Sequence, residues 1–190
     1  MQDISLHLLD IIENSIRAQA KLIKIEILVQ VMKNKLVITI EDDGVGMDAE
    51  TMQKAQDPFY TTKEQREKKV GLGIPLFKQN AEMCGGGFWM KSKPGHGTKI
   101  IAEFRYDHVD RMPLGNLTDT ILGAVIGHPE VDFVLKLHRH MVSGQQLDFE
   151  FDTRPVKREL EGIPLNYPEV YTLLQNEIKE GIIKTKMEEI

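Results

Sequence analysis

Residues 70–98 read VGLGIPLFKQNAEMCGGGFWMKSKPGHGT, and this stretch decides the fold. Gly71 and Gly73 precede an amphipathic segment that runs to Cys84, and Pro75 suits the first turn of a helix. Free backbone N–H groups at a glycine-rich helix start attract anions, and phosphate is a natural occupant. A P-loop needs a Lys and a Ser/Thr after its last glycine, and the spacing also differs from a dinucleotide fingerprint. The stretch therefore predicts a phosphate site of another kind.

The same stretch continues into two strands, expected over 87–92 and 98–106 and joined by the turn PGHG at 94–97. Glycines at the entry of the second strand lead to the hydroxyl of Thr98. Taken alone, this is an ordinary hairpin turn. Because the turn follows the glycine-rich helix start in the sequence, we interpret it as part of the same binding site.

A second motif, DDGVGM at 42–47, ends an alternating strand. Leu36, Ile38 and Ile40 share one face of this strand, and the period of two places Asp42 on that face. Gly44 and Gly46 allow a tight turn and a close approach to a flat ring, while the carboxylate accepts a hydrogen bond from an exocyclic amine such as that of adenine. An Asp/Gly turn with only a structural role is the alternative for this motif in isolation.

A third motif is the polar stripe of a helix expected over 3–18. Asp10, Asn14 and Arg17 fall within about 60° of one another, opposite an apolar face. The amide oxygen of Asn14 is a ligand type that Mg²⁺ accepts, and the guanidinium of Arg17 can meet phosphate. A solvated helix face is the alternative for the helix alone.

In this order the motifs resemble those of the GHKL ATPases, which include histidine kinases, gyrase, Hsp90 and the mismatch-repair ATPase. IIENSIRA at 11–18, DDGVGM at 42–47 and GLGIPL at 71–76 carry the likeness, and DPFYTTK at 57–63 resembles the lid motif of histidine kinases. The resemblance covers about 3–106. It implies ATP and Mg²⁺ as ligands, with Asn14 holding the metal and Asp42 holding adenine. The implied ATP-binding set also includes Arg17, Gly44, Gly46, Met47, Phe59, Thr61, Thr62, Lys63, Gly71, Leu72, Gly73, Ile74 and Thr98.

The expected fold class is α+β. By resemblance, residues 1–106 form a Bergerat-fold α/β sandwich, a mixed sheet with helices on one face. The segment 107–115 carries charges, Pro113 and Gly115 and shows no clear periodicity. We therefore predict a domain boundary there. Residues 107–190 are then expected to form a small α+β module used for partner binding or as a homodimer interface. Its last helix is expected to begin near Pro168, with Gly181 as a candidate break.

Composition excludes several other classes. The net charge of −5 comes without a Lys/Arg stripe, so nucleic acid is not an expected partner. No apolar run is long enough to span a membrane, and a single cysteine, Cys84, cannot form an internal disulfide. With no secretory signal at the start of the sequence, a cytoplasmic protein is expected.

The resemblance leaves the fate of the γ-phosphate open. Histidine kinases carry a phosphoacceptor hairpin before the ATP domain, and this sequence has none, so a kinase would act on a partner protein. Asp10 stands where the hydrolysing branches have a catalytic glutamate, and it is a candidate general base or a structural residue. An ATP-driven switch with slow hydrolysis and a non-catalytic ATP sensor are the alternatives. The C-terminal segment resembles tails of short ATP-binding proteins found near bacterial redox-enzyme genes, which points to a partner linked to a redox enzyme.

Overall fold

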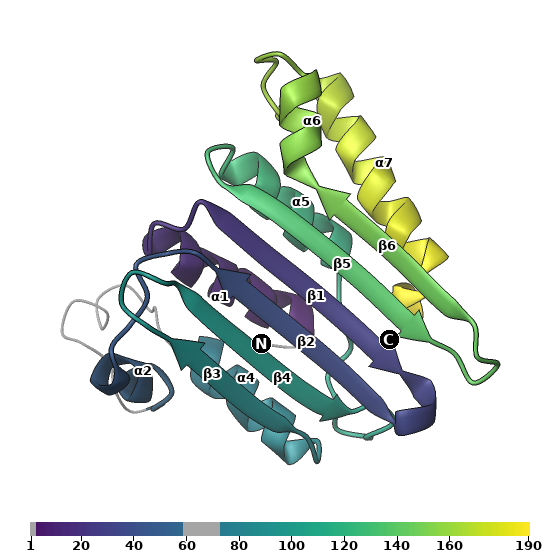
Figure 1. Ribbon diagram of the computed structural model, residues 1–190. Helices are drawn as coiled ribbons and strands as arrows, with labels where there is room; N and C mark the ends of the chain where they lie inside the picture. The colour runs from purple at the N-terminus through teal and green to yellow at the C-terminus, as the bar shows by residue number, and fades with distance from the viewer. Residues whose placement is uncertain (1–2, 59–72) are drawn as a thin grey trace.

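The computed structural model describes residues 3–58 and 73–190 (Figure 1). Along the chain the helices and strands are α1 Ile4–Arg17, β1 Leu22–Gln30, η1 Val31–Lys33, β2 Lys35–Asp42, α2 Ala49–Ala55, α4 Gly73–Met83, β3 Gly87–Ser92, β4 Thr98–Arg105, α5 Leu117–Gly127, β5 Asp132–His140, β6 Gln146–Asp152, α6 Thr153–Glu159, α7 Pro168–Lys184 and η2 Met187–Glu189.

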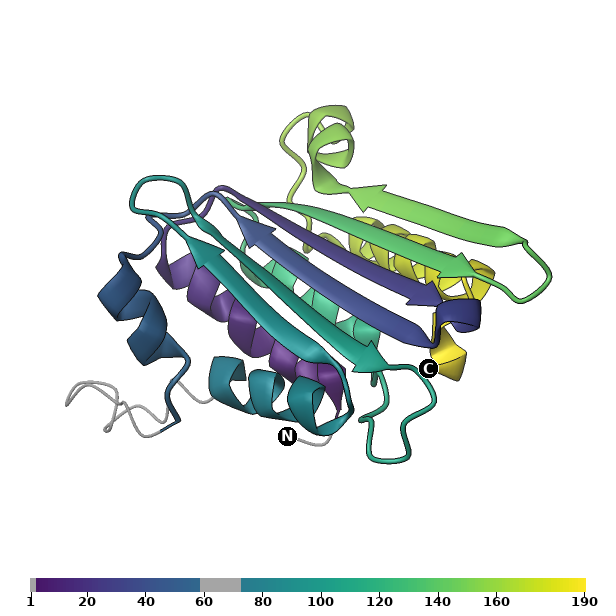
Figure 2. The ribbon, with the colours of Figure 1, turned by 60° about the horizontal axis from the view of Figure 1, so that its bottom comes forward.

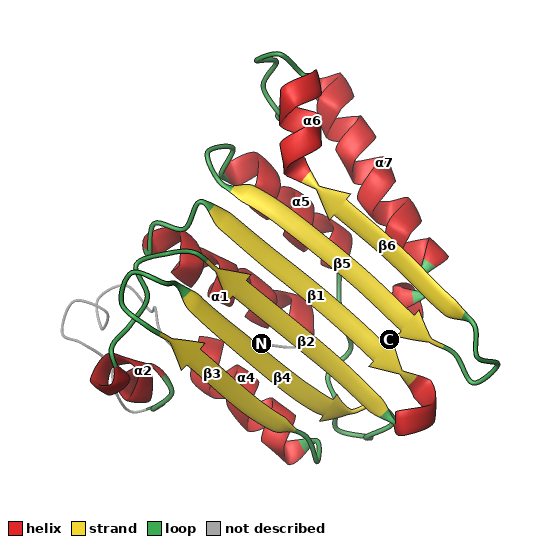
Figure 3. Cartoon of the chain, viewed as in Figure 1, coloured by secondary structure: helices red, strands yellow, loops and turns green. Residues whose placement is uncertain are grey.

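The strands form one six-stranded sheet in the order β3-β4-β2-β1-β5-β6. Strands β1 and β5 run parallel, and every other neighbouring pair is antiparallel. Helices α1, α4, α5 and α7 lie along one face of this mixed sheet, and the opposite face is open except near the end of β6, where α6 lies (Figures 2 and 3). The predicted fold class, a mixed sheet with helices on one face, is confirmed.

The core lies between the sheet and the helices. Ile25 pairs with Ile40 on β2 and with Leu135 on β5, and all three side chains are almost completely buried. Because side chains alternate along a strand, β1 and β2 each put apolar residues on the helix-covered face and more polar ones on the open face. The same alternation carries Asp42, at the end of β2, onto the covered face, where it is 7% exposed.

Residues 107–190 share this sheet and core, whereas the sequence predicts a module of their own. Strand β5 pairs with β1 in register from Leu22↔Asp132 to Gln30↔His140. The 107–115 segment is a connection that also holds the start of α1, because the Ile4 and Ser5 N–H groups donate to the carbonyls of Pro113 and Leu114. The loop signal in the sequence is therefore correct, but the chain after it returns to the existing sheet.

The last helix continues through Gly181, which the sequence marks as a candidate break. A Cβ at this position would lie 2.3 Å from the ring of Phe149 on β6. The glycine therefore lets α7 pack closely on the sheet. None of the helices in the described residues combines the length and apolar character required to cross a membrane.

Candidate functional site

A cavity of about 400 Å³ opens on the helix-covered side, at the ends of β2, β3 and β4 and against α1, α2 and the start of α4. It brings together residues from all three predicted motifs, including the hairpin turn that ends the 70–98 stretch. Those that line it are Asn14, Asp42, Gly46, Met47, Ile74 and Thr98. Segments far apart in the sequence thus meet at one edge of the sheet, as the order of the motifs implies.

Asp42 is fixed by three hydrogen bonds. Its Oδ2 accepts from the Ser15 hydroxyl at 2.8 Å, and its Oδ1 accepts from the N–H groups of Gly44 at 2.9 Å and Thr98 at 3.3 Å. A buried carboxylate needs such partners, because an unpaired charge away from water is costly. An ionised carboxylate has about four acceptor sites, so this group can accept a further hydrogen bond from a ligand in the cavity.

The loop after Asp42 is tightly joined to its neighbours. Gly46 has a φ of +66°, and a Cβ there would lie 2.0 Å from the Lys93 carbonyl oxygen. The Val45 N–H donates to the Ala18 carbonyl at 2.8 Å, and the Met47 N–H donates to the Ser92 hydroxyl at 2.8 Å. The glycine is required here for its backbone conformation and for its lack of a side chain. The loop is consequently held as one wall of the cavity.

Of the polar pair Asn14 and Arg17, only Asn14 lines the cavity. Asn14 lines the cavity, whereas Arg17 is exposed and its Nη1 donates to the Asn14 Oδ1 at 3.4 Å. The helical stripe predicted from the sequence therefore exists, but only its middle residue faces the cavity. The arginine contacts the amide oxygen that is the predicted metal ligand.

Asp10 is exposed and lies against the first residue of α4. A Cβ on Gly73 would be 2.6 Å from the Asp10 Cβ and 2.8 Å from its Oδ2. A carboxylate at this place is favoured by the positive end of the α4 dipole. Gly73 is therefore required for the close contact of α1 and α4, and Asp10 stands beside the predicted phosphate site without lining the cavity.

One turn before Asp10 on α1, His7 is buried at 1% exposure and its ring stacks on Phe77 at 5.4 Å between centroids. Burial lowers the pKa of His7, and the nearby backbone of Gly73 only partly opposes this effect. Neither ring nitrogen has a hydrogen-bond partner within the described residues. The α1–α4 contact next to the cavity thus contains a buried histidine whose pKa is lowered by its surroundings.

Sequence reasoning missed several lining residues. Ser15, which holds Asp42, follows Asn14 directly and faces the sheet. The others are apolar walls or side chains of α2, namely Ile11, Ala18, Thr51, Lys54, Ala55, Met90 and Ile100. Apolar residues on a helix or strand face are typical of a core, so only the three-dimensional arrangement shows which of them also border a cavity.

Six of the predicted site residues lie outside the described residues. They are Phe59, Thr61, Thr62, Lys63, Gly71 and Leu72. The described chain stops at Pro58, after α2, and resumes at Gly73, the first residue of α4. Ala55 of α2 and Ile74 of α4 line the cavity.

The cavity lining suits a flat ring that carries a hydrogen-bond donor. Ile11, Met90 and Ile100 offer apolar surface, and Asp42 offers a fixed acceptor. For a divalent cation the cavity supplies the amide oxygen of Asn14, and no group of three or more acidic, His or Cys side chains occurs in the described part of the chain. Mg²⁺ fits such a place when ligand oxygens and waters complete its shell.

Comparison with known proteins matches the part of the chain that contains this cavity. The model of the histidine kinase-, DNA gyrase B- and HSP90-like ATPases matches residues 2–108. The sensor protein DegM of Bacillus sp. (strain B21-2) is 32% identical over 94 residues, 50% of this chain and 24% of that protein. The sensor histidine kinase WalK of Bacillus subtilis (strain 168) is 32% identical over 74 residues, 37% of this chain and 12% of that protein.

The chain therefore spans a quarter or less of these relatives. Among solved structures, the N-terminal domain of a DNA repair protein has the same fold, with a TM-score of 0.51 and 14% identity, over 78% of this chain and 53% of that one. The family model covers more than half of the chain and includes every motif that meets at the cavity. The chain belongs to the histidine kinase-, DNA gyrase B- and HSP90-like ATPase family.

Proposed function

We propose that the protein binds ATP with Mg²⁺ in this cavity and transfers the γ-phosphate to a partner protein. The observation that carries the binding step is a buried carboxylate, Asp42, held by three donors and facing the same cavity as the amide of Asn14. Asp42 accepts the adenine amine, and Asn14 coordinates Mg²⁺ bound to the phosphates.

Likeness to sensor histidine kinases supports the transfer step. Phosphoryl transfer needs little covalent chemistry from the protein, and positioning together with electrostatic stabilisation supplies most of the catalysis. In this proposal the start of α4 at Gly73 faces the phosphates with its N–H groups, and the Arg17 guanidinium, bonded to Asn14, offsets negative charge nearby. The phosphoacceptor belongs to a partner, for which a protein linked to a redox enzyme is a candidate.

Slow ATP hydrolysis that drives a conformational switch is a second candidate, favoured by the place of Asp10. Residues four apart on a helix lie on the same face, with about 5–6 Å between their Cβ atoms. Asp10 therefore lies one turn from Asn14 along α1 and reaches the start of α4, where the phosphates are expected. A carboxylate there can activate a water for hydrolysis. The alternative is a purely structural role, in which Asp10 is stabilised by the dipole of α4.

Labelled ATP separates these functions. The protein is incubated with Mg²⁺ and γ-³²P-ATP, with and without a cell extract as the source of partners, and label is followed in protein and in free phosphate. Label in a protein band that Asn14→Ala abolishes supports the kinase. Free phosphate that Asp10→Asn abolishes supports hydrolysis. ATP binding with neither product contradicts both activities and leaves a sensor.

A further inference from the structure

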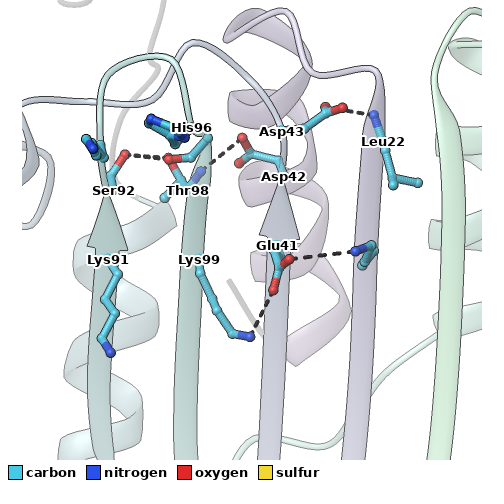
Figure 4. Close-up of a pocket in the computed structure, with 12 residues that line it drawn as sticks. Leu22, Glu41, Asp42, Asp43, Lys91, Ser92, His96, Thr98 and Lys99 are labelled. Atoms are coloured by element: carbon cyan, nitrogen blue, oxygen red, sulfur yellow. Dashed lines mark hydrogen bonds and ion pairs between the residues drawn. The ribbon is translucent and has the colours of Figure 1, made fainter.

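A second cavity, of about 420 Å³, lies at the same end of the sheet but on its open side (Figure 4). Four lysines contribute to its lining: Lys24, Lys91, Lys93 and Lys99. It shares Asp42 and Thr98 with the cavity on the helix-covered side. The two cavities therefore lie on opposite faces of the sheet, at the ends of the strands that carry Asp42 and Thr98.

Three of these lysines form a row across four strands. The register pairs Lys91 with Lys99, Lys99 with Glu41, and Glu41 with Lys24. Glu41 is shared, because its Oε2 meets the Lys99 Nζ at 2.9 Å and its Oε1 meets the Lys24 Nζ at 3.7 Å. Like charges directly opposite each other on neighbouring strands destabilise a sheet, so the Lys91–Lys99 pair has no stabilising role of its own.

The carboxylates that border this cavity are already engaged. The hydrogen bond from Lys99 holds the pKa of Glu41 below its usual value. The Asp43 Oδ1 accepts from the N–H groups of Lys21 and Leu22, at 2.7 and 2.9 Å, and the Asp42 side chain turns to the other face. Within the described residues, no carboxylate pairs with Lys91 or with the exposed Lys93, which follows in the turn. With four lysines and three carboxylates among the lining residues, the net charge of the cavity lining is positive.

We propose that this open-face cavity binds a phosphate group, as a free phosphate or on a phosphorylated side chain of a partner. A phosphate monoester carries about −1.5 to −2 charges near neutral pH and three acceptor oxygens, which suits a cavity lined by several lysines better than a single carboxylate does. Lysine serves as a point-charge ligand for phosphate. The site differs from the proposed nucleotide cavity, because Lys24, Lys91 and Lys99 lie on the opposite face of the sheet, although Asp42 and Thr98 border both cavities.

Amide NMR titrations with inorganic phosphate test the site residue by residue. We expect shifts at Lys91, Lys93 and Gly97 that saturate and that weaken as salt is added, because exposed charges are screened. A Lys91→Gln/Lys93→Gln double variant should bind about tenfold more weakly, since each exposed ion pair contributes up to about 1 kcal/mol. Lys33→Gln is the matched control, because Lys33 is exposed at η1, at the other end of β1 and β2.

Equal phosphate affinity in the double variant and the wild type would overturn the proposal. So would shifts confined to α1 and the start of α4, which would assign the phosphate to the other cavity. A phosphoserine peptide, with its unphosphorylated form as control, identifies the source. Tighter binding of the phosphopeptide than of free phosphate assigns the site to a phosphorylated partner, and equal binding assigns it to the free anion.

Discussion

The Asp42→Asn variant tests the most specific feature of the nucleotide cavity. Asparagine has nearly the same shape, and its Oδ1 can still accept from the N–H groups of Gly44 and Thr98. Its Nδ2, however, is a donor where the carboxylate offers an acceptor. If Asp42 accepts the adenine amine, the variant places two donors against each other and the ring loses its charged partner.

The expected loss follows from the type of bond. A hydrogen bond to a charged group contributes about 1.5–3 kcal/mol, and 1.4 kcal/mol is about a factor of ten, so the Kd for ATP should rise roughly ten- to hundredfold. Ser15→Ala is the control. It removes the 2.8 Å bond to Oδ2 and should lower the free energy of unfolding by about 1–2 kcal/mol, yet it leaves the charge of Asp42 in place.

Isothermal titration with ATP and Mg²⁺ gives the Kd, and thermal unfolding shows that each variant is folded. Asp42→Asn should affect ATP binding far more than Ser15→Ala does. A Kd for folded Asp42→Asn within twofold of the wild-type value would refute the assignment of Asp42 to adenine.

Three further predictions concern metal, pH and packing. Asn14→Ala should weaken ATP binding about tenfold with Mg²⁺ and much less in EDTA, as two parallel titrations would show; equal losses would remove Asn14 from the metal site. Burial lowers the pKa of His7 in the folded protein, so the unfolded chain takes up this proton at a higher pH than the folded protein does. The free energy of unfolding should therefore fall as pH drops below about 6.5, and His7→Phe should flatten that part of the stability profile measured by denaturation. An unchanged slope in the variant would contradict this. Gly181→Ala should lower the free energy of unfolding by roughly 1–2 kcal/mol in chemical denaturation, because overpacking on Phe149 outweighs the gain in helix propensity. Gly123→Ala on α5, where the added Cβ meets open space, should raise the free energy of unfolding by about 0.5–1 kcal/mol. A change of the same sign in both variants would contradict the role of packing at Gly181.

The features that sequence predicted well depend on local rules. The alternation of Leu36, Ile38 and Ile40 determines the buried face of β2, and it carries Asp42 to the cavity because the period of a strand is fixed. The glycine and proline signals around residue 73 mark the start of α4 in the same local way. Short-range rules of this kind assign a residue to a face of its own helix or strand from the sequence alone.

The features that sequence reasoning missed depend on which elements meet. Ser15 reaches Asp42 only because α1 packs across the end of β2, and no spacing along the chain encodes that contact. The same is true of Asp10, whose contact with Gly73 requires α1 and α4 to lie side by side. Arg17 belongs to the predicted polar stripe, but a stripe about 60° wide does not say which member faces a cavity.

The sequence of β5 contains a signal that residues 107–190 join the same sheet, but this signal is ambiguous. In β5 the neighbouring residues Phe133, Val134 and Leu135 are all buried, and such a continuous apolar run is typical of a parallel strand inside a sheet. Without β5, β1 would be an edge strand with unpaired backbone groups along its length. Pairing within the sheet satisfies both strands, whereas a separate module would leave each of them with an exposed edge.

This shared sheet also determines how the C-terminal half can act on the nucleotide cavity. Phe133 pairs with Ile23, and Ile23 pairs with Asp42, so the three residues form one row across β5, β1 and β2. All three are buried, and packed interiors transmit displacement rather than absorb it. A partner that binds residues 107–190 and shifts β5 would therefore move the strand that carries Asp42, and its effect on ATP affinity would pass through this row rather than through a flexible linker.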